Sequence, residues 1–313
     1  MVKETVVEVE GLRKHYPPDV KAVDGIDFEI HAGEVFSLLG PNGAGKTTTV
    51  EILEGLRNPT AGQIRVLGAV VPKDYARIRK RVGVLPQNFD PFDRLKARET
   101  VVYWAGLFER SLQKKEVDGV LRTVGLTARA DALAMHLSGG EKRRLGIAMA
   151  LVGEPELVFL DEPTTGLDPH GRRELWQVIR DLQKAGRTVL LTTHYLDEAE
   201  QLANRVAIMH KGKIVAQGTV EELLEKAGAG RWIVLSRPGE GAWEAVQRLG
   251  LPCRREDHGI AVHVLDIRRL RPVLGELTAL DVDLGEIATR RDSLEEVFLK
   301  LVGARLEEGE IRA

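Results

Sequence analysis

Cysteine is nearly absent from this chain, since Cys253 is the only one among 313 residues. A single cysteine cannot form an internal disulfide, which excludes the disulfide-stapled secreted domains and fits a reducing compartment. Paired cysteines that could hold zinc are lacking as well. Because no local nucleophile motif surrounds Cys253, we do not expect it to be catalytic.

Long apolar runs are also lacking. The longest, such as residues 147–152 and 189–193, fall far short of the roughly 18 to 20 residues that span a bilayer. Residues 1–5 alternate apolar and charged side chains and begin no apolar stretch of signal-peptide length. The sequence therefore predicts a chain that does not cross a membrane, so that any membrane role would come through a partner.

Charge of one sign is not in excess, because 45 Lys and Arg residues nearly balance 47 Asp and Glu residues. The formal net charge is -2, and no long basic run occurs. Such a balance does not favour a polyanion-binding surface, so no nucleic-acid partner is expected. With 43% hydrophobic and 29% charged residues, the composition is that of an ordinary soluble globular protein.

Several short apolar runs do not alternate with polar residues, as in residues 35–39, 157–160 and 189–192. They predict strands buried on both faces, which is typical of a parallel sheet covered by helices. Helical patterns lie between these runs, and residues from about 95 to 150 form a predicted helix-rich insert. The expected fold class is therefore α/β.

The composition changes at the Ala-Gly-Ala-Gly segment of residues 227–230, which predicts a boundary between domains 1–228 and 229–313. In the second domain, strand and helix patterns follow one another in an order typical of a small α+β unit of the split β-α-β type. The chain is thus predicted to hold one large domain and one small one.

A phosphate-binding loop pattern, Gly40 to Thr47, follows the first apolar run without a mismatch and precedes a helical stretch. Its glycines let several backbone N–H groups converge on a phosphate. Lys46 would reach the β- and γ-phosphates, and the Thr47 hydroxyl would ligate Mg²⁺. The predicted nucleotide-binding residues of this segment are Asn42, Gly43, Gly45, Lys46, Thr47 and Thr48.

Two acids, Asp161 and Glu162, end the apolar run of residues 157–160. Asp161, at the end of a buried strand, would hold Mg²⁺ through its water shell. Glu162 would orient and polarise the water that attacks the γ-phosphate. A structural alternative is that one of the two acids caps a helix or a turn, since Pro163 follows.

Residues 137–141, Leu-Ser-Gly-Gly-Glu, resemble the signature loop of ATP-binding-cassette (ABC) proteins, and further motifs follow in the order of that family. Gln87 matches the glutamine of the family's Q-loop, Asp168 its D-loop and His194 its switch histidine. Tyr16 stands where the family has an aromatic residue that stacks on adenine.

This resemblance covers about residues 7–218 and implies a P-loop NTPase of the ABC-cassette fold with a helical insert, which hydrolyses ATP with Mg²⁺. In the family, the residues that match Ser138, Gly139 and Gly140 contact the ATP of the other subunit, so a second copy of the chain is implied. The implied catalytic residues are Glu162, His194, Gln87 and Asp168, and the implied metal ligands are Thr47, Gln87 and Asp161. Glu141 departs from the family, which usually has glutamine there, and its role stays open.

Residues 192–200 and 293–299 are similar to segments of the drug-resistance-type exporters, the ABC-2 group. This similarity implies an integral-membrane permease as partner, a cytoplasmic location at the inner face of the cell membrane, and a C-terminal domain that dimerises or regulates. Nothing in the sequence selects the cargo. Two alternatives stay open, an importer subunit and a soluble ABC ATPase that acts on DNA or ribosomes. A GTPase is not expected, because no Asn-Lys-x-Asp motif occurs.

Overall fold

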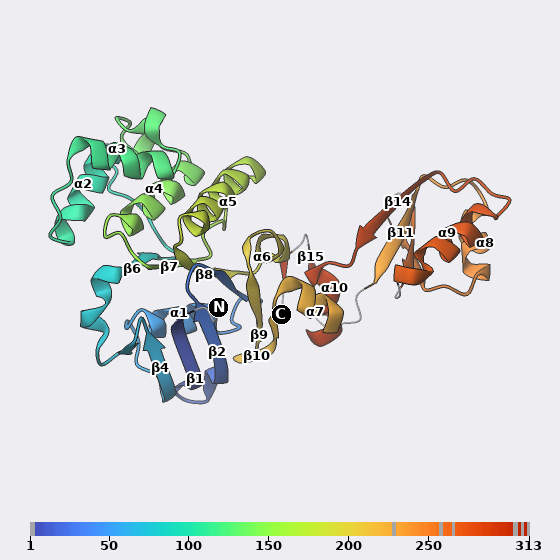
Figure 1. Ribbon diagram of the computed structural model, residues 1–313, viewed down its shortest axis with the longest axis horizontal. Helices are drawn as coiled ribbons and strands as arrows, with labels where there is room; N and C mark the ends of the chain where they lie inside the picture. The colour runs from blue at the N-terminus through green and yellow to red at the C-terminus, as the bar shows by residue number, and fades with distance from the viewer. Residues whose placement is uncertain are drawn as a thin grey trace. The chain divides into compact units, whose positions relative to one another are not determined.

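The computed structural model describes residues 4–226, 230–256, 259–264, 267–302, 306–307 and 310–311. Contacts between residues divide the chain into two compact units, which are Met1–Val220 together with Ala304–Ala313, and Glu221–Gly303 (Figure 1). The predicted boundary after residue 228 lies outside the described residues and stays a prediction.

A six-stranded sheet forms the centre of the first unit, with the strand order β10-β9-β3-β8-β7-β6. Five of its strands run parallel, and β10 pairs antiparallel with β9. The strands are β3 (Val35–Leu39), β6 (Val82–Leu85), β7 (Leu157–Asp161), β8 (Thr188–Thr193), β9 (Arg205–His210) and β10 (Lys213–Gly218). Because β3, β7 and β8 are buried along their whole length, the parallel sheet predicted from continuous apolar runs is confirmed.

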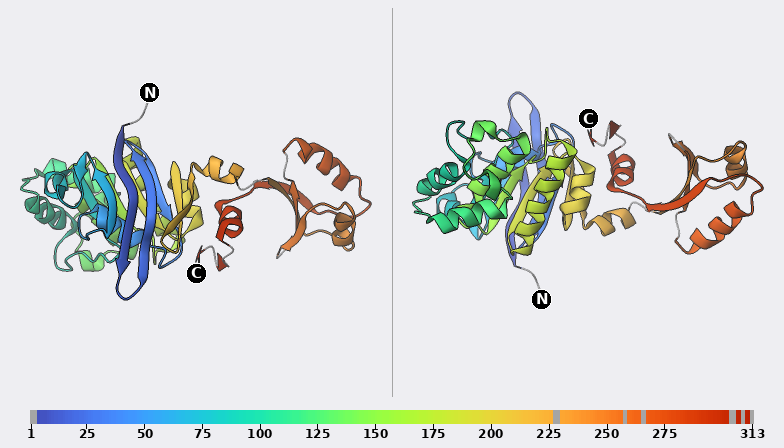
Figure 2. Two further views of the ribbon diagram at one scale, coloured as in Figure 1. Left: turned by 90° about the horizontal axis from the view of Figure 1, so that it is seen from below. Right: turned by 90° about the horizontal axis from the view of Figure 1, so that it is seen from above.

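A second, antiparallel sheet of order β2-β1-β4-β5 packs against one face of the central sheet across α1 (Lys46–Leu53). Its strands are β1 (Thr5–Tyr16), β2 (Val20–His31), β4 (Ala61–Val66) and β5 (Ala69–Val70). Figure 2 shows the long β1–β2 hairpin from two sides. Phe28 of β2 stacks on Phe36 of β3 with ring centroids 5.4 Å apart, so the two sheets share one apolar core.

Helices α4 (Gly139–Leu151), α5 (Pro169–Lys184) and α6 (Leu196–Leu202) cover the other face of the central sheet. Helices α2 (Ala97–Leu107) and α3 (Lys114–Thr123) pack against α4. Short 3-10 helices connect elements at Tyr75–Arg77, Arg79–Arg81, Thr127–Arg129 and Ala134–His136. Since α2, α3 and α4 occupy the stretch between β6 and β7, the predicted helix-rich insert is confirmed.

The second unit is built on a four-stranded antiparallel sheet of order β12-β13-β11-β14. The elements of this part of the chain are α7 (Val220–Lys226), β11 (Arg231–Ser236), α8 (Ala242–Arg248), β12 (Cys253–Glu256), β13 (Gly259–Val264), a 3-10 turn (Ile267–Arg269), α9 (Leu270–Thr278), β14 (Glu286–Arg291) and α10 (Leu294–Val302). Strands β11 and β12 run parallel to each other with β13 between them, which confirms the split β-α-β type. Two short strands, β15 (Leu306–Glu307) and β16 (Glu310–Ile311), pair near the end of the chain.

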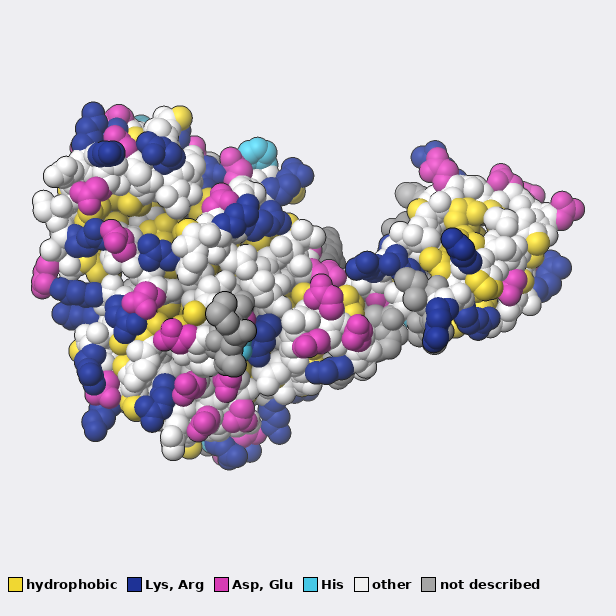
Figure 3. All heavy atoms as spheres, viewed as in Figure 1, with side chains coloured by type: hydrophobic (Ala, Val, Ile, Leu, Met, Phe, Trp, Pro, Cys, Tyr) yellow, Lys and Arg dark blue, Asp and Glu magenta, His cyan; other side chains and the backbone are white. Residues whose placement is uncertain are grey.

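The surface of the first unit is mixed in charge, as the face seen in Figure 3 shows, where basic and acidic side chains are interspersed. Within the described ranges, no helix is both long enough and apolar enough to traverse a lipid bilayer.

Candidate nucleotide-binding site

The phosphate-binding loop joins the end of β3 to the start of α1, at the edge of the sheet where the parallel strands end. Gly45 precedes the helix with a φ of 104°, in the left-handed region. A Cβ atom on Gly45 would lie 2.2 Å from the carbonyl oxygen of Ala22, so only glycine fits here. The loop therefore presents backbone N–H groups beside a helix N-terminus, an arrangement that binds phosphate.

The Lys46 side chain is held over this loop. Its Nζ donates to the carbonyl oxygens of Gly40 at 2.8 Å and Pro41 at 3.1 Å, and lies 3.3 Å from Oε1 of Glu162. Burial lowers the pKa of Lys46, while the charges of Glu162 and Asp161 raise it. The ammonium is thus aimed at the phosphate-binding loop by contacts that a polyphosphate could replace.

Asp161 ends β7 directly beside the loop. The Thr47 hydroxyl donates to Asp161 Oδ1 at 3.3 Å, and the Thr192 hydroxyl donates to the same oxygen. Burial raises the pKa of Asp161, while these two hydrogen bonds lower it. Thr192 is not among the predicted site residues. The parallel register of β7 and β8, which sets it opposite Asp161, cannot be read from either strand alone.

The Glu162 carboxylate is at the centre of the site. Its Oε2 accepts hydrogen bonds from Gln87 Nε2 at 3.1 Å and Thr165 Oγ1 at 3.2 Å, and His194 Nδ1 lies 3.3 Å away. Burial would raise the pKa of Glu162, but His194 and Lys46 lower it to about 2. The side chain is therefore an ionised carboxylate at neutral pH, the form that can accept a hydrogen bond from a water molecule.

The backbone of Glu162 has a φ of 46°, a left-handed conformation that is uncommon for residues other than glycine. Such a residue costs about 1–2 kcal/mol, and strain of this kind concentrates at functional sites. Its N–H donates to Thr192 Oγ1 at 2.9 Å, which holds the turn. The N-cap of α5 is Asp168, so neither Glu162 nor Asp161 caps that helix.

Two further motifs meet at the N-termini of α4 and α5. Ser138 caps α4 by accepting from the N–H of Glu141 at 3.2 Å, and Asp168 caps α5 by accepting from the N–H of Gly171 at 2.7 Å. A Cβ atom on Gly140 would lie 3.4 Å from Gly171 Cα, so the two helix ends are neighbours. Paired helix N-termini form a second position that favours an anion.

Glu141 has a structural role at this position. Its Oε2 accepts from the N–H of Ser138 at 2.8 Å, which completes a capping box, and its Oε1 lies 3.1 Å from Nε of Arg129. The pattern Ser-x-x-Glu before a helix is itself a signal for such a box in the sequence. The carboxylate at this position thus holds the backbone of the loop.

With Thr192 as the link between Asp161 and Glu162, the structure brings six of the predicted residues into one hydrogen-bonded or ion-paired cluster, which are Gln87, Lys46, Thr47, Asp161, Glu162 and His194. Within the described residues, no hydrogen bond or ion pair joins this cluster to Ser138, Gly139, Gly140 or Asp168. Asn42 and Gly43 are exposed at the tip of the loop, and Thr48 is half-buried on α1.

Tyr16 lies at the end of β1, in the hairpin whose second strand passes Gly45 at Ala22. A hollow of about 310 Å³ opens at this hairpin and is lined in part by Tyr16. Nζ of Lys14 lies 4.9 Å from the centre of its ring, and Cζ of Arg57 lies 5.9 Å away. The stacking of Tyr16 on adenine stays a prediction.

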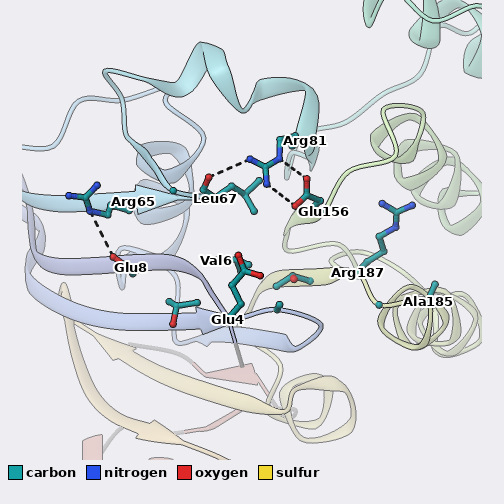
Figure 4. Close-up of a pocket in the computed structure, with 14 residues that line it drawn as sticks. Glu4, Val6, Glu8, Arg65, Leu67, Arg81, Glu156, Ala185 and Arg187 are labelled. Carbon is teal, nitrogen blue, oxygen red and sulfur yellow. Dashed lines mark hydrogen bonds and ion pairs between the residues drawn. The ribbon is translucent and has the colours of Figure 1, made fainter. Parts of the chain in front are cut away.

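A hollow of about 370 Å³ lies at the opposite end of the parallel strands, where Thr188 begins β8 and Glu156 precedes β7. Figure 4 shows two ion pairs among its charged side chains, Arg81 with Glu156 and Arg65 with Glu8. Arg81 donates to both carboxylate oxygens of Glu156, at 2.5 and 2.8 Å, and Arg65 lies 3.9 Å from Glu8. Because the hollow lies where the parallel strands begin, it is at the opposite edge of the sheet from the phosphate-binding loop.

Glu54, at the C-terminal end of α1, is a buried carboxyl outside this cluster. Its side chain is 5% exposed, and no hydrogen-bond partner of its Oε1 is among the described atoms. Burial raises the pKa of Glu54 to about 8, and the charge of Asp161 adds to the effect. Since the ordinary value is 4.5, folding favours the protonated carboxyl.

Glu54→Gln should stabilise the protein at alkaline pH. Stability that depends on the Glu54 proton is complete below pH 4.5 and is lost as the pH rises towards about 8, whereas an amide stays neutral. We expect the free energy of unfolding of the variant, relative to wild type, to rise by about 1.4 kcal/mol per pH unit in this interval. Denaturant unfolding at both ends of the interval measures the effect, with Glu10→Gln, at an exposed glutamate of β1, as the control. Equal differences at both pH values would contradict the prediction.

The phosphate-binding loop, the two acids after β7 and the paired N-termini of α4 and α5 define a nucleotide-hydrolysing P-loop cassette. The model of the family described as ABC transporter matches residues 23–165. A daunorubicin resistance ATP-binding protein of Streptomyces coeruleorubidus is 39% identical over 306 residues, which cover 96% of both chains. The chain therefore belongs to the ABC transporter family, as an ATP-binding protein that hydrolyses ATP.

Other relatives and solved structures agree. A linearmycin resistance ATP-binding protein of Bacillus subtilis is 33% identical and covers 97% of this chain and 100% of its own. A dimeric ATP-binding cassette in a post-hydrolysis state with ADP and Pi has a TM-score of 0.61 and 25% identity, over 68% of this chain and 98% of that one. The ATP-binding subunit of an ABC transporter has a TM-score of 0.62 and 29% identity, over 71% of this chain and 93% of that one. The predicted family and fold are thus confirmed.

Proposed function

We propose that the chain is the ATP-hydrolysing subunit of an ABC-2-type exporter, which works as a homodimer with ATP sandwiched between two copies and drives a separate membrane permease. The observation that carries the catalytic part is the Glu162 carboxylate, held ionised beside Lys46, Gln87 and His194. A buried carboxylate in this setting is a general base for the water that attacks the γ-phosphate of ATP.

Lys46 would neutralise the phosphates, and His194 would hydrogen-bond the γ-phosphate and the attacking water. At present both side chains lie 3.3 Å from Glu162. The Lys46 ammonium already makes charge-assisted bonds to the carbonyls of Gly40 and Pro41. A polyphosphate in the loop carries several negative charges and would compete with the single charge of Glu162 for this ammonium. Binding of ATP would therefore free Glu162 for the water.

Mg²⁺ fits the oxygen atoms near the loop. The Thr47 hydroxyl and the Asp161 carboxylate lie 3.3 Å apart. Gln87 donates from its amide Nε2 to Glu162, the residue that follows Asp161 in the chain. Hydroxyl, carboxylate and amide oxygens suit Mg²⁺, which takes its remaining ligands from phosphate and water. When bound with ATP, the ion would supply charge neutralisation at the β- and γ-phosphates.

A second copy would complete each site. The Ser138–Gly140 terminus and Asp168 form an anion-favouring position, and no hydrogen bond or ion pair joins it to the phosphate-binding loop of the same chain within the described residues. In a two-fold dimer, this terminus of one copy would face the γ-phosphate held by the other. One relative fold is solved as a dimer with ADP and Pi, which supports this arrangement. The C-terminal domain would stabilise or regulate the dimer.

The names of relatives support a permease as partner. Two of these relatives are resistance ATP-binding proteins. A third, a Nod factor export ATP-binding protein of Ralstonia nicotianae, is 42% identical over 70% of this chain. An apolar surface near Gln87 suits such a partner. Phe92, Val102, Tyr103 and Leu107 are about half exposed, and the Phe92 and Tyr103 rings meet edge to face at 5.3 Å. Exposed apolar groups of this kind mark interaction sites.

The test is capture of partners from solubilised native membranes with tagged Glu162→Gln protein and MgATP. We expect a polytopic membrane protein in the eluate, lost when Tyr103→Asp is added to the bait and kept when Val215→Asp, an exposed apolar residue on β10, is added instead. Capture of ribosomes or DNA-associated proteins in place of a membrane protein would support the soluble alternative. Transport assays on reconstituted complex would then separate an exporter from an importer.

A further inference from the structure

The helix that begins at the signature loop is fastened to the segment that carries Gln87. Arg143, in the second turn of α4, donates from Nη1 to the carbonyl oxygen of Pro86 at 3.2 Å and from Nη2 to that of Gln87 at 2.5 Å. Two guanidinium bonds to consecutive carbonyls fix both the position and the direction of this backbone. No role for Arg143 follows from the motifs of the sequence.

Close packing adds to this attachment. A Cβ atom on Gly146, three residues further along α4, would lie 2.5 Å from Leu85 Cδ1 and 2.9 Å from the Phe89 ring, so the helix approaches the segment through a glycine. Lys142 also reaches the segment, 3.2 Å from Asp90, but that pair is exposed, and exposed pairs contribute about 0–1 kcal/mol. Arg143 is therefore the half-buried polar link.

The same link extends to the catalytic carboxylate. Gln87, whose carbonyl oxygen Arg143 holds, donates its side-chain amide to Glu162 Oε2 at 3.1 Å. Burial lowers the pKa of Arg143, while the charges of Asp161 and Glu162 raise it, which means that the guanidinium lies within electrostatic reach of both acids. A continuous path runs from Ser138 through α4 and Arg143 to Gln87 and Glu162.

We propose that Arg143 is a positioning residue that ties the signature-loop helix to Gln87 and thereby couples the two ATP sites of the dimer. This inference rests on the shared sites proposed above. In such a dimer, Ser138 of one copy meets the ATP of the other, whereas Gln87 serves the site of its own copy. A shift of α4 on binding the partner's ATP would move Gln87 and so set the orientation of Glu162 in the first copy.

The test is a double-mutant cycle of Arg143→Ala and Gln87→Ala, with ATPase rates measured against ATP concentration. Arg143→Ala should lower kcat by about tenfold to 100-fold, the size expected for a displaced positioning group, and bring the Hill coefficient towards 1. ATP affinity measured with the isolated monomer should not change, because Lys46 and Thr47 are untouched. The double variant should have the kcat of Gln87→Ala alone, since Arg143 acts through Gln87.

Effects that multiply in the double variant would overturn the proposal, as would a wild-type Hill coefficient of 1. Arg143→Lys should regain part of kcat, because an ammonium can reach one of the two carbonyls, and Lys142→Ala should match wild type as the neighbouring control. A general loss of structure would instead leave Arg143→Lys and Arg143→Ala alike. ATP-driven dimerisation of the wild type tests the shared sites separately, so the two failures are distinguishable.

Discussion

Glu162→Gln should reduce the steady-state ATPase rate by at least about 100-fold and leave ATP binding intact. Glutamine has the size of glutamate and can still accept from Thr165 and face Gln87, which both contact Glu162 Oε2. It carries no charge, however, and cannot take a proton from water at neutral pH. The lost step is therefore chemistry alone.

The measurement pairs phosphate release with equilibrium binding of labelled ATP. Glu156→Gln serves as the control, because Glu156 is an acid of the same unit whose partner, Arg81, lies at the other edge of the sheet. It should turn over ATP at the wild-type rate. Hydrolysis by Glu162→Gln within tenfold of wild type would mean that another group activates the water, and Asp161 would be the next candidate.

Part of this site can be predicted from the sequence because each motif is local. The turn from Gly40 to Thr47, the two acids after an apolar run and the Ser-Gly-Gly loop each lie within a few residues. A parallel sheet then brings the phosphate-binding loop and the two acids to one edge, since the ends of β3, β7 and β8 share that edge, whereas the Ser-Gly-Gly loop begins α4 in the helical insert. The identity of these residues and their closeness in the fold can thus both be predicted from the sequence.

The contacts that set the pKa values and orientations in the site cannot be predicted from the sequence, because they join residues far apart in the chain. Thr192 reaches Asp161 only through the register of β7 and β8, and Arg143 reaches Gln87 only through the packing of α4 on β6. Glu54 belongs to an ordinary helical pattern, and only its burial raises its pKa. Such effects depend on desolvation and proximity, which a local pattern does not contain.

The same distinction holds for the fold. The strands of the central sheet are buried on both faces and therefore have continuous apolar sequences, which predict them well. The β1–β2 hairpin is half exposed, and its register shifts at several points between Thr5 and His15. These irregularities interrupt the alternation of polar and apolar residues that identifies a strand at a surface. No prediction of that antiparallel sheet was therefore possible from periodicity.

Ser138→Arg should abolish ATP-driven dimerisation. Ser138 caps α4 through Glu141, and its hydroxyl lies where the helix N-terminus would meet the partner's γ-phosphate. An arginine side chain adds bulk at this contact, and a cation at a helix N-terminus is unfavourable with respect to the helix dipole. The measurement is size-exclusion chromatography with MgATP. Glu162→Gln alone should elute as a dimer, and Glu162→Gln combined with Ser138→Arg should elute as a monomer.

Ser138→Ala separates the two effects of this change. Both substitutions remove the N-cap, which costs about 1 kcal/mol of stability, but alanine leaves the contact surface open. We therefore expect Ser138→Ala to dimerise with weaker ATP dependence and Ser138→Arg not to dimerise, while both bind ATP as monomers through Lys46. If Ser138→Arg dimerised as readily as the parent, the helix terminus would not lie at the interface, and each chain would have to hydrolyse ATP with its own residues alone.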